Sequence, residues 1–342
     1  MATYDGFFDT LGLRDWCDAV NNDAPMSMAQ LLSQSGTGDV ETEVLPFPSL
    51  DVLHESCGRI GQTRDLTAGI ENGFLAIRGG LKTVLDPITQ PLSWLLDGAL
   101  YAFAALPWWL LIPLLVILTW SVSRSKGVTA FVAAVFLFFG VIDHYDVAMQ
   151  TLAIIFVCTG LSVLIGVPIG IAMSKSDTTQ RMVVPILDLL QTLPTFVYLI
   201  PLIFLFSVTE SKLYGIAIIL YAVVPVIRLT DLGIRLVDPD VIEAADAFGM
   251  TKRQKLFGVE LPLALPNIMA GVNQTIMMSL AMVVIASLVS APGLGVLVLR
   301  GIRNLELGVG IVAGLGIVLL AVVLDRVSKS ALNRINVTHD KH

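Results

Sequence analysis

The stretch LPLALPNIMAGVNQTIMMSLAMVVIASLVSAPGLGVLVL, Leu261 to Leu299, contains no charged residue. A helix needs about 20 apolar residues to cross about 30 Å of hydrocarbon. This run is therefore too long for one span and too short for two spans with a turn. We expect one membrane-spanning helix that ends near Ser290, followed by a segment at the membrane interface, residues 291–306.

The whole chain has the composition of an integral membrane protein. Of its 342 residues, 55% are hydrophobic and 14% are charged, with a mean hydropathy of +0.79, whereas soluble domains contain about 25% charged residues. The sequence predicts an all-α polytopic membrane protein with about seven transmembrane helices. The other uncharged runs that predict spans are Gly98–Trp120, Gly127–Ile142, Val147–Ser174, Leu189–Thr209, Leu213–Ile227 and Leu307–Leu324.

The distribution of Lys and Arg predicts the orientation, because these residues accumulate in cytoplasmic loops. With the C-terminus inside, the outside loops after the first span hold only Lys212, Arg300 and Arg303. The inside loops then hold Arg124, Lys126, Lys175, Arg181, Arg228, Arg235, Lys252, Arg253, Lys255, Arg326, Lys329, Arg334 and Lys341. We therefore expect an exported N-terminal tail (1–97), two first spans (98–146), a core (147–326) and a cytoplasmic C-terminal tail (327–342).

The N-terminal tail is predicted to have two parts. It starts without a basic and apolar signal peptide, and its segments 21–30 and 33–43 are polar, which indicates loose order. Near 70–97, apolar residues recur at helical spacing, which is typical of a helix on the outer membrane surface or of one packed on protein. Cys17 and Cys57 both fall in this tail and could form one disulfide.

Motifs for catalysis are missing from the sequence. GGLKT, Gly79–Thr83, lacks the Gly-Lys pair of a phosphate loop, and the four histidines have no metal-ligand spacing. Ionisable residues within the predicted spans stand close to the cytoplasmic ends, which weakens the case for an ion-coupled pump; these residues are Asp188, Arg228, Asp231 and Asp325. We expect a chain that is not an enzyme and holds no metal.

Two predicted spans carry uncharged polar residues. Polar groups in a membrane need hydrogen-bond partners inside the helix bundle. These residues therefore either join helices or line a solute path, and both interpretations stay open. Near the kink made by Pro194 they are Gln191 and Thr192, together with the aromatic residues Phe196 and Tyr198. In the following polar span they are Asn273 and Gln274, with Met277 beside them.

The stretch EAADAFGMTKRQKLFGVELPLALP, Glu243–Pro266, is polar although uncharged runs flank it. Asp238 is a good N-cap, Gly249 suits a left-handed helix stop, and Thr251 with Gln254 forms a capping box. Two prolines are expected to end the second helix before the next span, Pro262 and Pro266. The sequence thus predicts a helix–turn–helix elbow that protrudes into the cytoplasm as a rigid docking element.

The elbow resembles the EAA loop of ABC importer permeases. Glu243-Ala244-Ala245, then Gly249, then Val259-x-Leu261-Pro262 reproduces the family spacing, with Val in place of Ile. The segments LLQTLPTFVYLIP and LPLALPNIMAGVNQTIM are similar to the glycine betaine/proline betaine permease subfamily, and the likeness runs from about Asp146 to Asp325. APGLG at residues 291–295 departs from the Gly-Gly-Leu-Gly that relatives often carry.

The resemblance implies a type I ABC importer permease fold in a bacterial inner membrane. A coupling loop, 236–262, would dock on a separate ATPase through Glu243, Ala244, Ala245, Gly249, Leu261 and Pro262. Two ATP-binding subunits would hold ATP and Mg, a second permease copy would complete a homodimer, and an exported binding protein would deliver solute. This chain would carry no cofactor and bind no nucleic acid. Glycine betaine leads as solute, ahead of proline betaine, choline, carnitine and trimethylamine N-oxide.

Two other classes of function compete with this reading. One is an ATP-independent channel or secondary transporter, in which the elbow would be a linker. The other is a structural membrane subunit of an enzyme complex. Sparse charge within the spans disfavours the secondary transporter, and the complete elbow spacing disfavours both.

Overall fold

Helices are the only regular elements in the computed structural model, which describes residues 3–13, 53, 57 and 63–339. Within this part, four stretches are long and apolar enough to cross a membrane. They are α8 (Tyr145–Lys175), α11 (Ser211–Arg235), the helix that contains α14 (Leu261–Ala286), and most of α16 (Leu307–His339). The predicted all-α membrane fold is confirmed.

Two further spans are broken rather than straight. Helix α5 (Thr63–Ala105) meets α6 (Trp108–Ser123) at 113°, and α9 (Asp177–Thr192) meets the segment of η1 (Thr195–Tyr198) and α10 (Leu199–Leu205) at 107°. The kink predicted at Pro194 is confirmed, and the break at Pro107 is a feature that the predicted span Gly98–Trp120 did not include.

Proline explains both breaks. Pro107 and Pro194 have extended ψ angles of 148° and 133°, and each stands just before a new helix starts. Proline lacks an N–H and disfavours the helical conformation in the residue before it. Leu193 accordingly has ψ of 134°. Hydropathy alone does not register such breaks, because both sides of each proline are equally apolar.

Helix α14 ends where the sequence predicted. A 3-10 turn, η3 (Ser287–Val289), follows it, and Ser290 has φ of 75°. Gly293 has φ of 117°, and a Cβ there would lie 2.3 Å from Thr151 Oγ1. The short helix α15 (Leu294–Arg303) then packs against α16. The predicted end near Ser290 is confirmed, and the place of α15 at a membrane interface stays a prediction.

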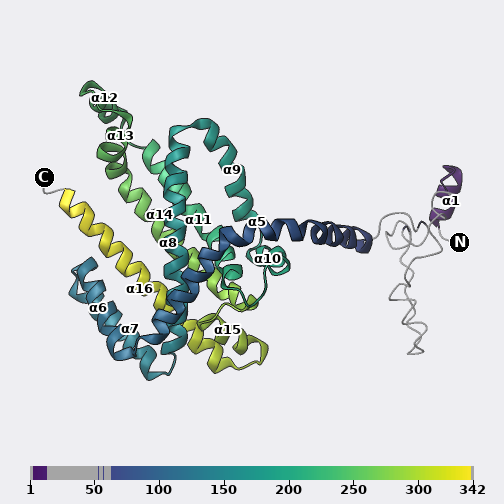
Figure 1. The fold of residues 1–342 in the computed structure, drawn as a ribbon, viewed down its shortest axis with the longest axis horizontal. Coiled ribbons are helices and arrows are strands. Elements are labelled where there is room, and N and C mark those ends of the chain that lie inside the picture. The colour runs from purple at the N-terminus through teal and green to yellow at the C-terminus, as the bar shows by residue number, and fades with distance from the viewer. Residues whose placement is uncertain (1–2, 14–52, 54–56, 58–62, 340–342) are drawn as a thin grey trace. The chain divides into compact units, whose positions relative to one another are not determined.

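Helices α8, α11 and α14 pack against one another at the centre of the bundle (Figure 1). Glycines permit this close approach: a Cβ on Gly170 of α8 would lie 2.7 Å from Ile227 O of α11, and one on Gly271 of α14 would lie 3.0 Å from Val226 Cα. Such small residues let helix backbones pack tightly in membranes. The remaining apolar helix, α7 (Lys126–Val141), packs against α6 and α16.

The chain divides after Gly80 into two units. In the first unit, α1 (Thr3–Thr10) carries Phe8, which is buried with Cys57. The predicted amphipathic segment near 70–97 falls inside α5. The tail segments 21–30 and 33–43 and the pairing considered for Cys17 lie outside the described residues.

Candidate functional site

The elbow begins with α12 (Pro239–Ala247), whose ends match the sequence signals. The Asp240 N–H donates to Asp238 Oδ1 at 2.9 Å, and Pro239 occupies the first helical position. Gly249 has φ of +72°, the left-handed conformation that favours glycine. The predicted N-cap and turn are confirmed.

The second half of the elbow is α13 (Lys252–Lys255), which starts with the predicted capping box. The Thr251 N–H donates to Gln254 Oε1 at 2.9 Å, and the Gln254 N–H donates back to Thr251 Oγ1 at 3.4 Å. Two donors at the helix start are thus satisfied by side chains, which fixes the geometry of the turn.

The expectation that Pro262 and Pro266 end this helix is wrong. Instead, α13 continues through the π-helical segment η2 (Leu256–Glu260) into α14. In η2 the Leu261 N–H bonds to Leu256 O, five residues back. A proline ring normally clashes with the carbonyl four residues earlier, and the wider π turn relieves this conflict before Pro262.

A polar clasp joins the two halves of the elbow. Lys255 Nζ donates to both carboxylate oxygens of Asp246, at 2.7 and 2.9 Å. The Met250 N–H donates to Ala245 O at 3.2 Å, and Ala245 is buried. The elbow is therefore a defined unit rather than a solvated linker.

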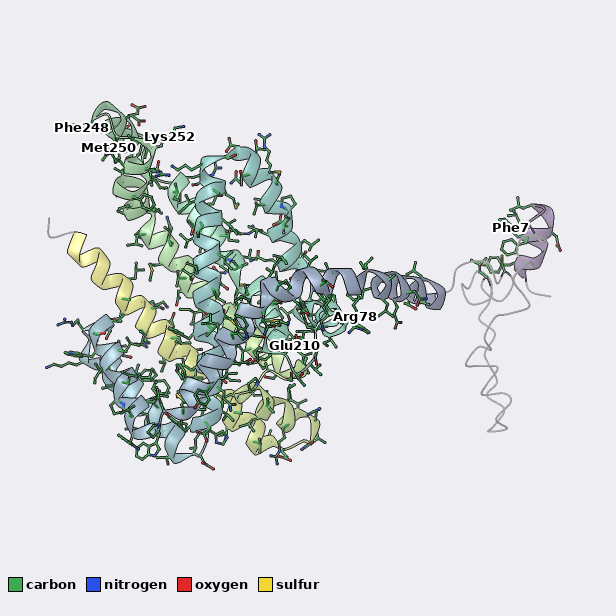
Figure 2. All side chains as sticks on the ribbon, in the orientation of Figure 1. Phe7, Arg78, Glu210, Phe248, Met250 and Lys252 are labelled. Carbon is green, nitrogen blue, oxygen red and sulfur yellow. The ribbon has the colours of Figure 1, made fainter. Side chains whose placement is uncertain are left out.

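The outer surface of the elbow exposes three large apolar side chains among its charged ones. Phe248 is 88% exposed, and Val241 and Phe257 are exposed as well. Figure 2 shows Phe248 at the tip of the elbow, close to Met250 and Lys252. Exposed aromatic side chains on a rigid, capped surface are typical of a protein interaction site.

The residues of the EAA pattern divide into exposed and buried ones. Glu243 and Ala244 are exposed, and Glu243 forms no ion pair or hydrogen bond with another described residue. Leu261 packs on the buried residues Ile234, Ala264 and Ile268, which anchors the stem to α11 and α14.

Sequence reasoning missed Glu260, between Val259 and Leu261. Only 4% of this residue is exposed, and its carboxylate pairs with Lys175 at the end of α8. A signal was available, because Glu260 is the last charged residue before the uncharged run that starts at Leu261. A charge at that border needs a partner if the helix continues into the membrane.

The polar residues predicted near the kink of α9 lie on both sides of the break. Gln191 and Thr192 are exposed at the end of α9, and Thr192 Oγ1 donates to Leu189 O of its own helix at 3.3 Å. In η1, Phe196 is exposed. Tyr198 is buried, and its hydroxyl has no hydrogen-bond partner among the described residues. A discontinuous helix with an unpaired polar group resembles the solute sites of membrane transporters.

On α14 the predicted polar residues have different environments. Asn273 Nδ2 donates to Asp325 Oδ1 of α16 at 3.0 Å, and Ser328 Oγ donates to Asn273 Oδ1 at 2.7 Å. Asn273 therefore joins helices, which favours the interhelical reading for this residue. Gln274 is exposed and Met277 is half-buried.

The fold brings the two predicted groups to neighbouring elements, because η1 packs against α14. A shallow cavity of about 260 Å³ lies elsewhere, and none of its lining residues belongs to the predicted path. These lining residues are Phe103, Ala104, Asp146, Met149 and Gln150.

Comparison with known proteins gives consistent matches. A family model described as the binding-protein-dependent transport system inner membrane component matches residues 162–336. The chain is 42% identical over 263 residues, 77% of its length and 86% of the relative's, to the glycine betaine transport system permease protein OpuAB of Bacillus subtilis. It is 40% identical to the glycine betaine/proline betaine permease protein ProW of Escherichia coli, over 73% of this chain and 70% of that one.

A solved structure shares the fold. A chain of the MetNI methionine ABC transporter, in an inward-facing conformation, superposes with a TM-score of 0.50 at 20% identity. The match covers 55% of this chain and 94% of that one. At this identity the likeness concerns the fold alone.

Proposed function

The chain belongs to the family of binding-protein-dependent transport system inner membrane components, and from this premise we propose that it is the permease subunit of an ATP-driven importer for a betaine-type compatible solute. The multi-pass helical fold and the relatives named as glycine betaine permeases support this proposal. The capped elbow with its exposed phenylalanine is the observation that carries it.

The elbow is the docking element for a separate ATPase subunit. Burying a phenylalanine that is almost fully exposed stabilises a complex by about 1.5–3 kcal/mol, and Phe248 is 88% exposed in the isolated chain. The capping box and the Lys255–Asp246 clasp keep the tip in one conformation. A rigid tip loses little conformational entropy on docking and transmits displacement rather than absorbing it.

In this proposal the elbow lies in the cytoplasm and the N-terminus outside, as the Lys and Arg distribution indicates. Two copies of the permease form the translocation unit, and two ATPase subunits bind ATP and Mg. An exported binding protein delivers the solute. Closure of the ATPase pair draws the two elbows together and opens the solute path outwards.

Glycine betaine is the first candidate solute. The relatives OpuAB and ProW are named for glycine betaine, and ProW also for proline betaine. A quaternary ammonium group is recognised by several aromatic faces through cation–π attraction. Near the α9 break, the candidate aromatic residues are Phe196, which is exposed, and Tyr198, which is buried. Selection of the solute therefore rests with the binding protein, while the permease supplies the path along η1 and α14.

The experiment is purification of the tagged full-length chain in mild detergent from its own membrane. ATPase activity should co-purify with the wild type and should be reduced with Gly249→Val, while the amount and melting temperature of the permease stay the same. Adding the binding protein with each candidate betaine identifies the solute by stimulation of ATP hydrolysis. Wild-type chain that carries no ATPase under conditions that preserve the complex would favour the channel reading.

A further inference from the structure

The elbow leaves the bundle after α11 and returns to it through η2 at the start of α14. Both of its arms are tied to the same short segment of the chain. On the returning side, Glu260 of η2 forms an ion pair with Lys175, the last residue of α8. The Glu260 carboxylate is almost fully buried, whereas the Lys175 side chain reaches partly into solvent. A buried carboxylate without its cation is strongly disfavoured, so this pair holds the stem to the end of α8.

On the outgoing side, Arg235 is the last residue of α11 before the elbow. Its Nη1 donates to Asp177 Oδ1 of α9 at 2.9 Å, and its Nη2 donates to Met173 O of α8 at 2.8 Å. Asp231, one turn earlier, accepts from Arg235 Nε at 2.9 Å and from Gln180 Nε2 of α9 at 2.8 Å. Both arms of the elbow therefore bind residues 173–180, which we name the α8–α9 corner.

The α8–α9 corner is itself stiff. A single non-helical residue, Ser176, separates α8 from α9, and its hydroxyl caps α9 by accepting the Thr179 N–H at 3.3 Å. Deeper in the membrane, Gly170 allows α8 to approach α11 closely. A short capped connection with close packing on one side moves as a body rather than bending.

We propose that the α8–α9 corner is the relay that passes the displacement of the elbow to the broken helix of the solute path, with Lys175 and Glu260 as its positioning pair. The inference rests on the proposed function of the elbow. Helix α9 runs from the corner directly to the break at Leu193–Pro194 and on to η1. A shift of the elbow that carries Glu260 and Arg235 must carry the start of α9, and α9 then moves Tyr198 and the rest of η1.

The same contacts could serve stability alone, and the two roles have different consequences. If these contacts serve stability alone, each variant should lose yield and melting temperature in proportion to its loss of transport activity. A relay loses solute transport per ATP while assembly and ATP hydrolysis persist. The ratio of imported solute to hydrolysed ATP separates the two.

The test uses the full complex of permease, ATPase and binding protein in lipid vesicles, with radiolabelled glycine betaine or whichever betaine the wild type imports fastest. Glu260→Gln keeps the shape of the side chain and removes its charge, and Lys175→Met removes the other partner. We expect ATPase co-purification with both variants and import per ATP about tenfold lower, within the range of ordinary coupling energies. The exchange Lys175→Glu with Glu260→Lys should recover import per ATP to within about threefold of the wild type, because it restores an ion pair.

Asp188→Asn is the matched control. Asp188 of α9 pairs with Arg228 of α11, but the Asp188 side chain is 56% exposed whereas that of Glu260 is 6% exposed, and the pair lies away from the corner. Exposed pairs contribute little, so import per ATP should change less than about twofold. The relay would be refuted if both single variants imported as much solute per ATP as the wild type. It would also be refuted if the losses followed the melting temperature and the charge exchange restored nothing. Either result would leave the proposed function standing. A wild type that binds no ATPase would remove both.

Discussion

Replacing Gly249 with valine tests whether the left-handed turn of the elbow is needed for docking. Gly249 has φ of +72°, and an added Cβ would meet no atom of the described residues within 4 Å apart from its two chain neighbours. A side chain therefore causes no clash within the permease, and its effect comes from the backbone. Holding an L-residue in the left-handed conformation costs about 1–2 kcal/mol, which lowers the population of the docking-competent turn about 5- to 30-fold.

The assay is the affinity of the ATPase subunit for purified permease in lipid nanodiscs. Because apparent affinity falls with the fraction of competent conformer, Gly249→Val should weaken binding about 5- to 30-fold. Asparagine adopts the left-handed conformation more readily than other residues with a side chain, so Gly249→Asn is the matched control. It should weaken binding less than about threefold.

Equal weakening by asparagine and valine would refute this reasoning, since the volume of the side chain at the contact would then matter and not the conformation of the turn. Unchanged binding in both variants would contradict the docking assignment itself. The melting temperature of the permease should stay the same in both, because Gly249 is exposed and supports no buried contact.

Three further predictions concern the tip, the bundle and the predicted path. Phe248→Ser should weaken ATPase binding about 10- to 100-fold, as expected from the loss of one buried aromatic side chain, with no change in permease melting temperature; retained affinity would place the docking contact elsewhere. Gly170→Ala should lower the free energy of unfolding by about 1–3 kcal/mol, because its Cβ would lie 2.7 Å from a backbone oxygen of α11. Gly160→Ala is the control and should not lower it, because a Cβ there would meet no atom of another described helix within 4 Å. Similar melting curves for the two variants would disprove the close packing. Asn273→Ala should lower the melting temperature, since Asp325 loses a donor, and should leave the preference among betaines unchanged; altered preference in competition assays would return Asn273 to the solute path.

Local features of the fold followed from the sequence. Asp238, Gly249 and the pair Thr251–Gln254 act through contacts a few residues apart, and the end of α14 near Ser290 depends on its own neighbours. The breaks at Pro107 and Pro194 also have a local cause in the sequence, the prolines themselves. Hydropathy does not reveal these breaks, because the residues on both sides of each proline are apolar. Pro262 shows the reverse case: a residue that usually ends helices stands in one, because a π turn rearranges the hydrogen bonds before it.

The candidate site was predictable to the same extent. The elbow could be recognised from its spacing and caps, since docking elements need a defined local conformation. The environment of Asn273 could not, because Asp325 is 52 residues away and nothing in the sequence ties an amide on one span to a carboxylate on another. The exposure of Phe248 also depends on what the rest of the chain leaves uncovered.

By itself, the sequence determined that the chain is a helical membrane protein, the approximate extent of its long apolar helices, and the capped elbow between α11 and α14. These features depend on the length of apolar runs and on hydrogen bonds within one turn. Only the tertiary structure decided which charges meet. Lys175 and Glu260 are 85 residues apart. They pair because α8 and α14 pack side by side, which brings the last residue of α8 and the residue just before α14 to the same end of the bundle.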